Sequence, residues 1–551
     1  MKKYLVTVMM AISLCMALSL TGCNAKSDEN ESLADSENLQ DTEASEDETD
    51  AGDMAENEDE DASEEAEEAV MAQSSYVDFS TETKYFYESD EESGRTLASS
   101  VYELIDIESE DTPQLDAAIE QWNSDREKEY DDFYQQSIDL AKTDFAENQE
   151  WWTDAYTSQA NCIIKRADKK VFSFMEDCYS YMGGAHGNST CTGYNFDVET
   201  GKDILLTDVV NDISVLPKLL EEKLLEKYES DIFLDPDIAG CIETNYLQFS
   251  NEGYSEMQFI VGYEGITIFF NAYDLSYYAA GTQEITLLYQ DYPDLLKPDY
   301  FTEVPESYAV QMQYYNETEL ASASGQGLRT ISVYGAMDEY DTYETITVVV
   351  DGNETIQECY TYEINPYYVK VKDKSYLYIQ MKAENDYQTV MIFDISGDKA
   401  VYVNEFDGHL IDFTNPESFV VEEWLGLLSN YGATRTFHVG DDGVPVCDSE
   451  DYEIDFDRTI ISTVELEGEI IDAKTGEATG ESTGEPTEEP TGTDVFPAGT
   501  EFRFLRTDNA SYVQMEASDG RIVRFDVTSE WPQMINGKEA MSCFEELWYA
   551  G

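Results

Sequence analysis

Short runs of aromatic and β-branched residues, each closed by a tight turn, recur through the middle of this chain. The turns include Asp351-Gly352, Lys372-Asp373-Lys374 and Ser396-Gly397-Asp398. Such runs are typical of strands, and such short turns connect antiparallel neighbours. Residues 301–437 are therefore predicted to form an antiparallel β-meander, and Phe419–Leu428 is expected to add one helix. The expected strands are Ile346–Val350, Tyr367–Val371, Tyr376–Met381, Val390–Ile395 and Ala400–Val403.

Residues 76–300, which precede the meander, mix two hydrophobic periods. Helical spacing covers Leu115–Trp152 and Val215–Tyr228. Strand-like runs at Asn161–Lys165 and Val171–Tyr181 flank a polar turn and predict a hairpin. A mixture of helices and hairpins predicts an α+β module. Its further strands are expected at Met257–Val261, Gly265–Phe270 and Glu284–Tyr289.

Residues 438–551 are predicted to form a β-rich C-terminal module that resembles a small β-barrel. Within them, residues 474–494 carry a four-residue repeat of Thr, Gly, Glu and Pro that is low in complexity and predicted to be flexible. Strands are expected on both sides of this repeat, and Ser518-Asp519-Gly520 predicts a hairpin turn. About fifty residues alone make a thin core, so we favour an enlarged loop over a domain linker. The whole chain is thus a multidomain protein, with an α+β module, a meander and this last module.

The chain has 118 acidic and 31 basic residues, a formal charge of -87. Residues 27–69 contain 21 of the acidic residues, and residues 1–26 contain three of the basic ones, which leaves 97 acidic and 28 basic residues elsewhere. The folded part is therefore strongly acidic by itself. Such a field repels phosphate backbones and anionic lipids, which disfavours nucleic acid as a partner, and it attracts cationic partners.

The N-terminus has the pattern of a secretion signal. Lys2 and Lys3 precede an apolar run, which ends at Leu20-Thr21-Gly22-Cys23. This ending resembles the lipobox of bacterial lipoproteins, which implies acylation of Cys23 and cleavage before it. Residues 1–23 are thus a signal, residues 24–75 an acidic, disordered tether, and the body is expected on the outer face of the cytoplasmic membrane, with no cytoplasmic domain. The alternative is an uncleaved membrane anchor.

Seven cysteines remain after Cys15, in the signal, and Cys23. There is no CxxC pair, no zinc-type Cys/His cluster and no EF-hand loop, so no metal or cofactor is expected. Cys178 and Cys191 flank a glycine-rich turn and are candidates for a disulfide across a hairpin. Buried free thiols are the alternative.

That turn, Gly183-Gly184-Ala185-His186-Gly187, is the most informative motif. Its glycines allow positive φ or a close approach of the backbone. His186 is one of three histidines, and a ligand-binding role for Gly183, Gly184, His186 and Gly187 competes with a structural turn. A wall hydrolase built on His186 and Asp197 is an alternative function, but a general base also needs a nucleophile, and none is apparent.

Six blocks of sequence occur in a fixed order between about residues 76 and 298. They are Gly183–Gly187, Tyr194–Asp197, Thr200–Lys202, Leu205–Asp208, Gly265–Asn271 and Tyr278–Ile285. Together these blocks resemble the extracellular domain of the anti-sigma-V factor family. The resemblance implies an α+β module that senses lysozyme; similar modules precede polysaccharide deacetylase domains.

These observations predict a non-catalytic surface lipoprotein that binds or senses a cell-wall component. The expected partner is a wall glycan or a cationic wall-active protein such as lysozyme. Besides the hydrolase, a structural lipoprotein with diffuse cation binding is the remaining alternative.

Overall fold

The computed structural model describes residues 75–152, 154–247, 257–322, 327–454, 459–471, 492–545 and 547–549. The described residues do not include the signal or Cys23, and they include almost none of the tether. They also do not include residues 472–491 of the repeat. Lipidation at Cys23 therefore stays a prediction. The described chain is a strand-rich, multidomain protein with several antiparallel sheets.

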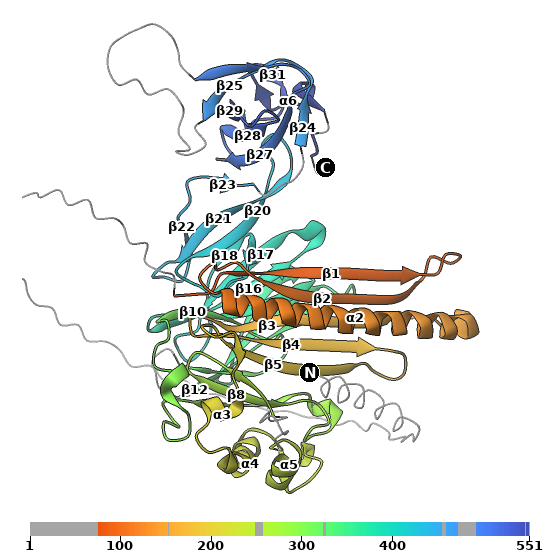
Figure 1. Ribbon diagram of the computed structural model, residues 1–551, viewed down its shortest axis with the longest axis vertical. Helices are drawn as coiled ribbons and strands as arrows, with labels where there is room; N and C mark the ends of the chain where they lie inside the picture. Colours follow the sequence, from red (N-terminus) through yellow and green to blue (C-terminus); the bar gives the residue numbers. More distant parts are fainter. Residues whose placement is uncertain are drawn as a thin grey trace, which may run out of the picture. The chain divides into compact units, whose positions relative to one another are not determined.

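A six-stranded sheet opens the fold, in the order β1-β2-β3-β4-β5-β6 (Figure 1). Only β2 and β3 run parallel, and helix α2, Pro113–Asn148, connects them. The predicted hairpin before the glycine turn is confirmed as β3–β4. The strands are β1 Phe79–Ser89, β2 Thr96–Ile107, β3 Tyr156–Ala167, β4 Val171–Tyr181, β5 Asn188–Asp197 and β6 Lys202–Asp203.

Helix α2 covers one face of this sheet. Proline at its start suits the first helical turn, where a backbone N–H has no partner in the helix. Its 36 residues span about 54 Å. Leu115, Ile119 and Trp122 pack against Phe172 and Phe174 of the sheet. No helix in the described ranges is both long and apolar enough to cross a membrane.

The opposite face of the sheet meets a smaller, three-stranded sheet of β7 Gln258–Val261, β8 Gly265–Phe270 and β9 Gln283–Leu288. Met175 and Cys191 from the large sheet pack with Ile260 and Phe269 from the small one. The far side of the small sheet carries α3 Leu206–Val209, α4 Leu216–Lys227 and α5 Ile238–Asn245. The expected helices and strands of the α+β module are therefore confirmed, with boundary shifts of a few residues.

Residues 301–437 were predicted to form one antiparallel β-meander. Most of this region instead forms two sheets that pack face to face. A five-stranded sheet has the order β10-β15-β16-β17-β18, and a four-stranded sheet the order β11-β12-β13-β14. The strands β10–β14 are Ser307–Gln311, Thr318–Ala321, Leu328–Met337, Tyr343–Val350 and Asn353–Thr361. The strands β15–β18 are Glu363–Val371, Lys374–Lys382, Gln388–Asp394 and Val401–Asp407. The strands expected in this region are present, all with antiparallel partners.

Strand β16 explains why this segment is so continuously apolar. Seven of its nine residues are buried. Leu377 and Ile379 face the core shared with the four-stranded sheet. Tyr376 and Tyr378 face a second core, which strands β19–β21 complete. A strand that is covered on both faces loses the usual alternation of apolar and polar residues.

The C-terminal strands form one large sheet, with the main order β19-β20-β21-β23-β27-β28-β29-β25-β26. Its end strands β19 and β26 do not pair, so the expected small barrel is corrected to an open sheet for the described residues. The strands β19–β24 are His409–Ile411, Phe419–Leu425, Tyr431–Val439, Pro445–Cys447, Tyr452–Glu453 and Thr459–Ser462. The strands β25–β29 and β32 are Leu466–Ile471, Thr493–Phe496, Glu501–Thr507, Tyr512–Ala517, Ile522–Asp526 and Phe544–Glu545.

Three sequence expectations for this region have clear outcomes. The helix expected at Phe419–Leu428 is wrong, because β20 occupies Phe419–Leu425. The predicted boundary at residue 437 lies inside β21. The loop interpretation of the repeat agrees with the topology, since β25 and β26 on its two sides pair with each other. The pair β30 Met534–Ile535 and β31 Lys538–Glu539, followed by α6 Ala540–Cys543, completes the described fold.

Candidate functional site

The glycine-rich turn joins β4 to β5, whose last backbone pair is Ser180 with Asn188. Gly183 and Gly184 have φ angles of 83° and 104°. These values lie where side chains with a Cβ are strained, so the turn needs glycine at both positions. The predicted structural role of these two glycines is thereby explained.

Gly187 is required for a different reason. A Cβ on Gly187 would overlap the ring of Tyr179, which lies against the turn from β4. The missing side chain therefore lets an aromatic ring approach the backbone closely. Tyr179 itself remains exposed to solvent.

His186 lies exposed on this turn and stacks on Tyr278. The ring centroids are 4.1 Å apart, with 23° between the planes. The Nδ1 atom of His186 is 2.8 Å from the Gly187 carbonyl oxygen, which can only accept, so Nδ1 carries the proton. The Tyr278 hydroxyl donates to the same carbonyl over 2.9 Å. Histidine and tyrosine are thus fixed to the turn and to each other.

Tyr273 extends this aromatic surface. Its ring lies 5.5 Å from that of Tyr278, and its side chain is exposed. Burial, and then the neighbouring Tyr179 and Tyr273, raise the pKa of Tyr278 above its ordinary value, so its hydroxyl stays protonated as a donor. We call Tyr179, His186, Tyr273 and Tyr278 the turn cluster.

Asn271 anchors the segment that carries Tyr273 and Tyr278. Its side-chain oxygen accepts from the Cys191 amide over 2.7 Å, and its side-chain nitrogen donates to the Cys191 carbonyl over 3.0 Å. This double hydrogen bond connects the end of β8 to β5. Three of the sequence blocks that carry the family resemblance, Gly183–Gly187, Gly265–Asn271 and Tyr278–Ile285, therefore meet at one place.

The turn cluster offers flat aromatic faces and polar groups at fixed positions. Tyrosine provides a large, stiff contact area and a hydroxyl that can form hydrogen bonds. His186 adds Nε2, which has no hydrogen-bond partner within the described ranges. Those ranges also contain no group of three or more His, Cys, Asp or Glu that could hold a metal ion. The arrangement is suited to recognition of a ligand with both apolar faces and hydroxyl groups.

The structure does not bring His186 and Asp197 together. Asp197 ends β5 at the opposite end from the turn, and ten strand residues span about 30 Å. The Asp197 carboxylate instead accepts hydrogen bonds from the backbone and side chain of Thr200. The acid–base pair suggested for a hydrolase is therefore not formed.

The candidate disulfide between Cys178 and Cys191 is wrong. Both thiols are free, and Cys178 pairs with Thr190 while Cys191 pairs with Asp177. This register points the two side chains to opposite faces of the sheet. Cys178 packs near Tyr102 and Tyr130 under α2, whereas Cys191 packs toward the small sheet.

Sequence reasoning found the turn but missed its aromatic partners. Tyr278 stood in a block that supported the family resemblance, yet nothing in the sequence placed it on His186, about ninety residues earlier. The position of Tyr179 could have been predicted in part from the sequence. Side chains alternate between the two faces of a strand, so Tyr179 must share one face of β4 with the residues two positions before and after it.

The described chain is strand-rich, and the turn cluster is an aromatic patch on its surface. Within this chain, residues 108–189 match the family model described as deacetylase PdaC. This segment contains α2, β3, β4 and the glycine turn, and is a small part of the 551-residue chain. The match agrees with the resemblance to modules that accompany deacetylases, whereas the anti-sigma-V resemblance stays a prediction from the sequence blocks. No curated protein matches the chain.

Two solved structures are similar at low identity. A DUF3298-family protein from Bacteroides fragilis has 17% identity and a TM-score of 0.32, covering 40% of this chain and 94% of that chain. A DUF3298-family protein from Pseudomonas aeruginosa has 16% identity and a TM-score of 0.28, covering 41% of this chain and 96% of that one.

Proposed function

We propose that this protein is a lipid-anchored, non-catalytic protein of the cell surface that binds a glycan of the cell wall through the turn cluster. The observation that carries the proposal is the stack of His186 on Tyr278, with Tyr179 and Tyr273 beside it. Exposed aromatic rings held in fixed positions are a costly feature for a soluble surface unless they contact a partner.

The supporting arguments come from location and family. The signal and Cys23 predict a body outside the membrane, where wall glycan is the surrounding polymer. The segment that matches the deacetylase PdaC family model ends just after the turn, at residue 189. The sequence resemblance of residues 76–298 adds that similar modules precede polysaccharide deacetylase domains. A binding module needs only contact area and hydrogen bonds, both of which the turn cluster supplies.

The test is binding of the full chain to purified peptidoglycan and to soluble oligomers of N-acetylglucosamine. We expect Tyr278→Ala and His186→Ala each to weaken binding about tenfold, the effect of removing a central aromatic contact. Tyr340→Ala is the matched control, because Tyr340 is 75% exposed in the turn between β12 and β13. Tyr278→Phe keeps the ring but loses the hydrogen bond to Gly187, so it separates stacking from turn geometry. Unchanged binding by Tyr278→Ala in a folded variant contradicts the proposal.

A second candidate is supported by charge alone. The chain outside residues 1–69 has 97 acidic and 28 basic residues, which favours a cationic wall-active protein such as lysozyme. Retention of lysozyme by the full chain would then fall steeply as salt rises, while turn-cluster variants would bind as well as the wild type. No retention at any ionic strength excludes this candidate.

A further inference from the structure

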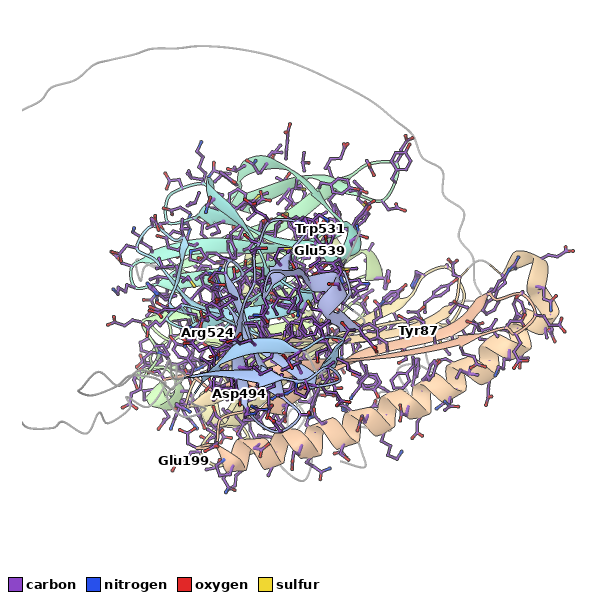
Figure 2. All side chains as sticks on the ribbon, turned by 90° about the horizontal axis from the view of Figure 1, so that it is seen from above. Tyr87, Glu199, Asp494, Arg524, Trp531 and Glu539 are labelled. Atoms are coloured by element: carbon purple, nitrogen blue, oxygen red, sulfur yellow. The ribbon has the colours of Figure 1, made fainter. Side chains whose placement is uncertain are left out.

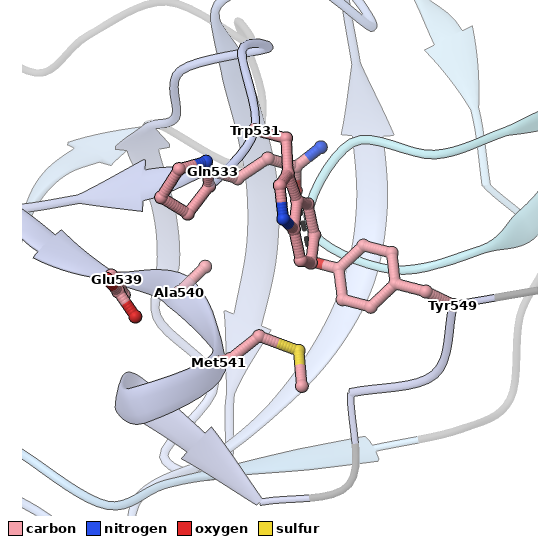
Figure 3. A pocket seen from close by; sticks show the side chains of 7 residues that line it. Trp531, Gln533, Glu539, Ala540, Met541 and Tyr549 are labelled. Atoms are coloured by element: carbon pink, nitrogen blue, oxygen red, sulfur yellow. Dashed lines mark hydrogen bonds between the residues drawn. The ribbon is translucent and has the colours of Figure 1, made fainter. Parts of the chain in front are cut away.

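A second aromatic site lies in the C-terminal module, apart from the turn cluster. Trp531, between β29 and β30, and Tyr549, after β32, form two walls of a cavity of about 270 Å³. Their ring centroids are 5.3 Å apart, with 83° between the planes. Met541 of α6 faces the same space, and Glu539 lies beyond Ala540 (Figure 3). Trp531 and Glu539 also lie close together when viewed from above (Figure 2).

One wall of the cavity, Tyr549, is held in place by hydrogen bonds. The Tyr549 hydroxyl donates to the side-chain oxygen of the buried Gln533 over 3.0 Å. The same oxygen accepts from the Leu428 amide, and the Gln533 side-chain nitrogen donates to the Gly426 carbonyl. All polar atoms of this glutamine are therefore engaged, and they fix Tyr549 relative to the start of the C-terminal sheet. Trp531 by contrast is 67% exposed, so much of its side chain is accessible to a ligand.

The charge of the residues that line the cavity favours a cationic ligand. Among the described residues that line the cavity, Glu539 is the only charged one, and it is exposed. The neighbouring Lys538 is occupied elsewhere, because its ammonium donates to the Glu465 carbonyl over 3.1 Å. Faces of Trp and Tyr rings attract cations through their quadrupoles, and a carboxylate adds to that attraction. Pro532, Ala540 and Met541 add apolar surface that suits methyl groups, and Gln533 also lines the cavity, with its side-chain polar atoms already hydrogen-bonded.

We propose that this cavity binds a quaternary or alkylated ammonium group. Two aromatic rings at nearly a right angle and a thioether line the space, and one carboxylate lies at its edge (Figure 3). At about 270 Å³ the cavity is just below the usual range for drug-sized ligands, about 300–1,000 Å³, so it accommodates a group of the size of a headgroup. The overall acidity of the protein adds a long-range attraction for the same charge. The site is independent of the proposed glycan site.

Choline is the probe, and its binding to the full chain is measured by ligand-observed NMR. We expect choline to bind and its uncharged isostere 3,3-dimethylbutan-1-ol not to bind detectably. Trp531→Ala should weaken choline binding about fivefold or more, since one cation–π face is lost. Glu539→Gln should weaken it about threefold at low salt, with a smaller difference at high salt. Trp424→Ala is the matched control, because Trp424 is 59% exposed on β20, outside the cavity.

The outcomes separate this proposal from its alternatives. Equal binding of the isostere, or choline binding that survives Trp531→Ala, overturns the cation site, as does the absence of choline binding at millimolar concentrations. Retention on phosphatidylcholine vesicles that free choline displaces identifies a lipid headgroup as the source of the ammonium group. Choline binding without vesicle retention identifies a soluble or wall-bound source. The turn-cluster variant Tyr278→Ala should leave choline binding unchanged, so failure of the glycan proposal leaves this one standing.

Discussion

Arg166 illustrates how single residues hold this protein together. Its side chain is completely buried at the end of β3. The Nε atom donates to the Asp168 carboxylate over 2.8 Å, and Nη1 donates to the carbonyls of Gly262 and Tyr300, each over 2.8 Å. The guanidinium also lies 5.4 Å from the centre of the Tyr263 ring. One residue therefore connects the β3–β4 hairpin, the β7–β8 turn and the segment after β9.

Replacement of Arg166 should be severely destabilising. Arg166→Met removes the donor to Oδ2 of the buried Asp168 carboxylate and to two backbone carbonyls, and removing one partner of a buried ion pair costs about 3–5 kcal/mol of unfolding free energy. Urea denaturation followed by circular dichroism measures this loss. Arg503→Met is the control, because the Arg503–Glu516 pair is largely exposed and should contribute less than about 1 kcal/mol. Equal effects of the two substitutions would show that Arg166 is not the connection described.

Helices and strands with a regular hydrophobic pattern were predicted well from the sequence. The other elements depend on tertiary contacts that the sequence pattern does not show. Helix α2 followed from its spacing, and β16 from its unbroken apolar run. Residues Phe419–Leu428 were expected to form a helix, but Val420 and Val421 favour a strand and pair with β21. The glycine turn was visible in the sequence, whereas Trp531 and Tyr549 lie eighteen positions apart without any motif. A contact between two aromatic residues that are far apart in the sequence cannot be predicted from any local sequence pattern.

The β25–β26 hairpin offers a test at the scale of one element. Its strands pair Glu469 with Thr493, so the chain is already paired on both sides of residues 472–491. Replacing residues 472–491 by a four-residue Gly/Asn linker should raise the unfolding free energy by about 1 kcal/mol, since a shorter loop costs less entropy to close. Thermal unfolding measures the change, and a scrambled sequence of equal length should leave stability as it is. Loss of the folded C-terminal module would show that these residues belong to its core.

Across the whole molecule, buried carboxyl groups set an unusual dependence of stability on pH. Burial is the main cause that raises the pKa of several of them above the ordinary 3.8 for Asp or 4.5 for Glu. They occur in the α+β module and at Asp412 of the C-terminal sheet. These groups are Glu103, Glu176, Asp177, Asp274, Glu284 and Asp412. Each one binds its proton more tightly in the folded protein than in the unfolded chain.

The sign of the effect follows from linkage. Between the ordinary and the raised pKa values the folded state holds more protons, so the free energy of unfolding falls as pH rises through that window. Repulsion among the many acidic groups grows in the same direction. Exposed Asp90 and Asp519 have lowered pKa values, and their stabilising contribution is lost only as pH falls below about 3.8.

We therefore expect the free energy of unfolding to fall as pH rises above the ordinary pKa values of these carboxyl groups, 3.8 for Asp and 4.5 for Glu. Calorimetric melting temperatures at constant ionic strength, measured from these values upward, give the trend. Glu176→Gln should flatten it, because this buried carboxyl, hydrogen-bonded to Tyr130 and Tyr194, no longer ionises. A melting temperature that rises with pH over this range would contradict the expectation.

Strand β16 also restricts where this chain can be truncated and where related genes can recombine. Because its alternate side chains complete two cores, an expressed fragment that lacks β19–β21 would expose Tyr376 and Tyr378 and aggregate through that bare surface. Recombination between related genes at a point within residues 307–439 would combine core residues from two different proteins. The side chains that meet in each of the two cores would then no longer be matched to one another. We expect homologous proteins to exchange this segment only as a whole, whatever varies at its borders.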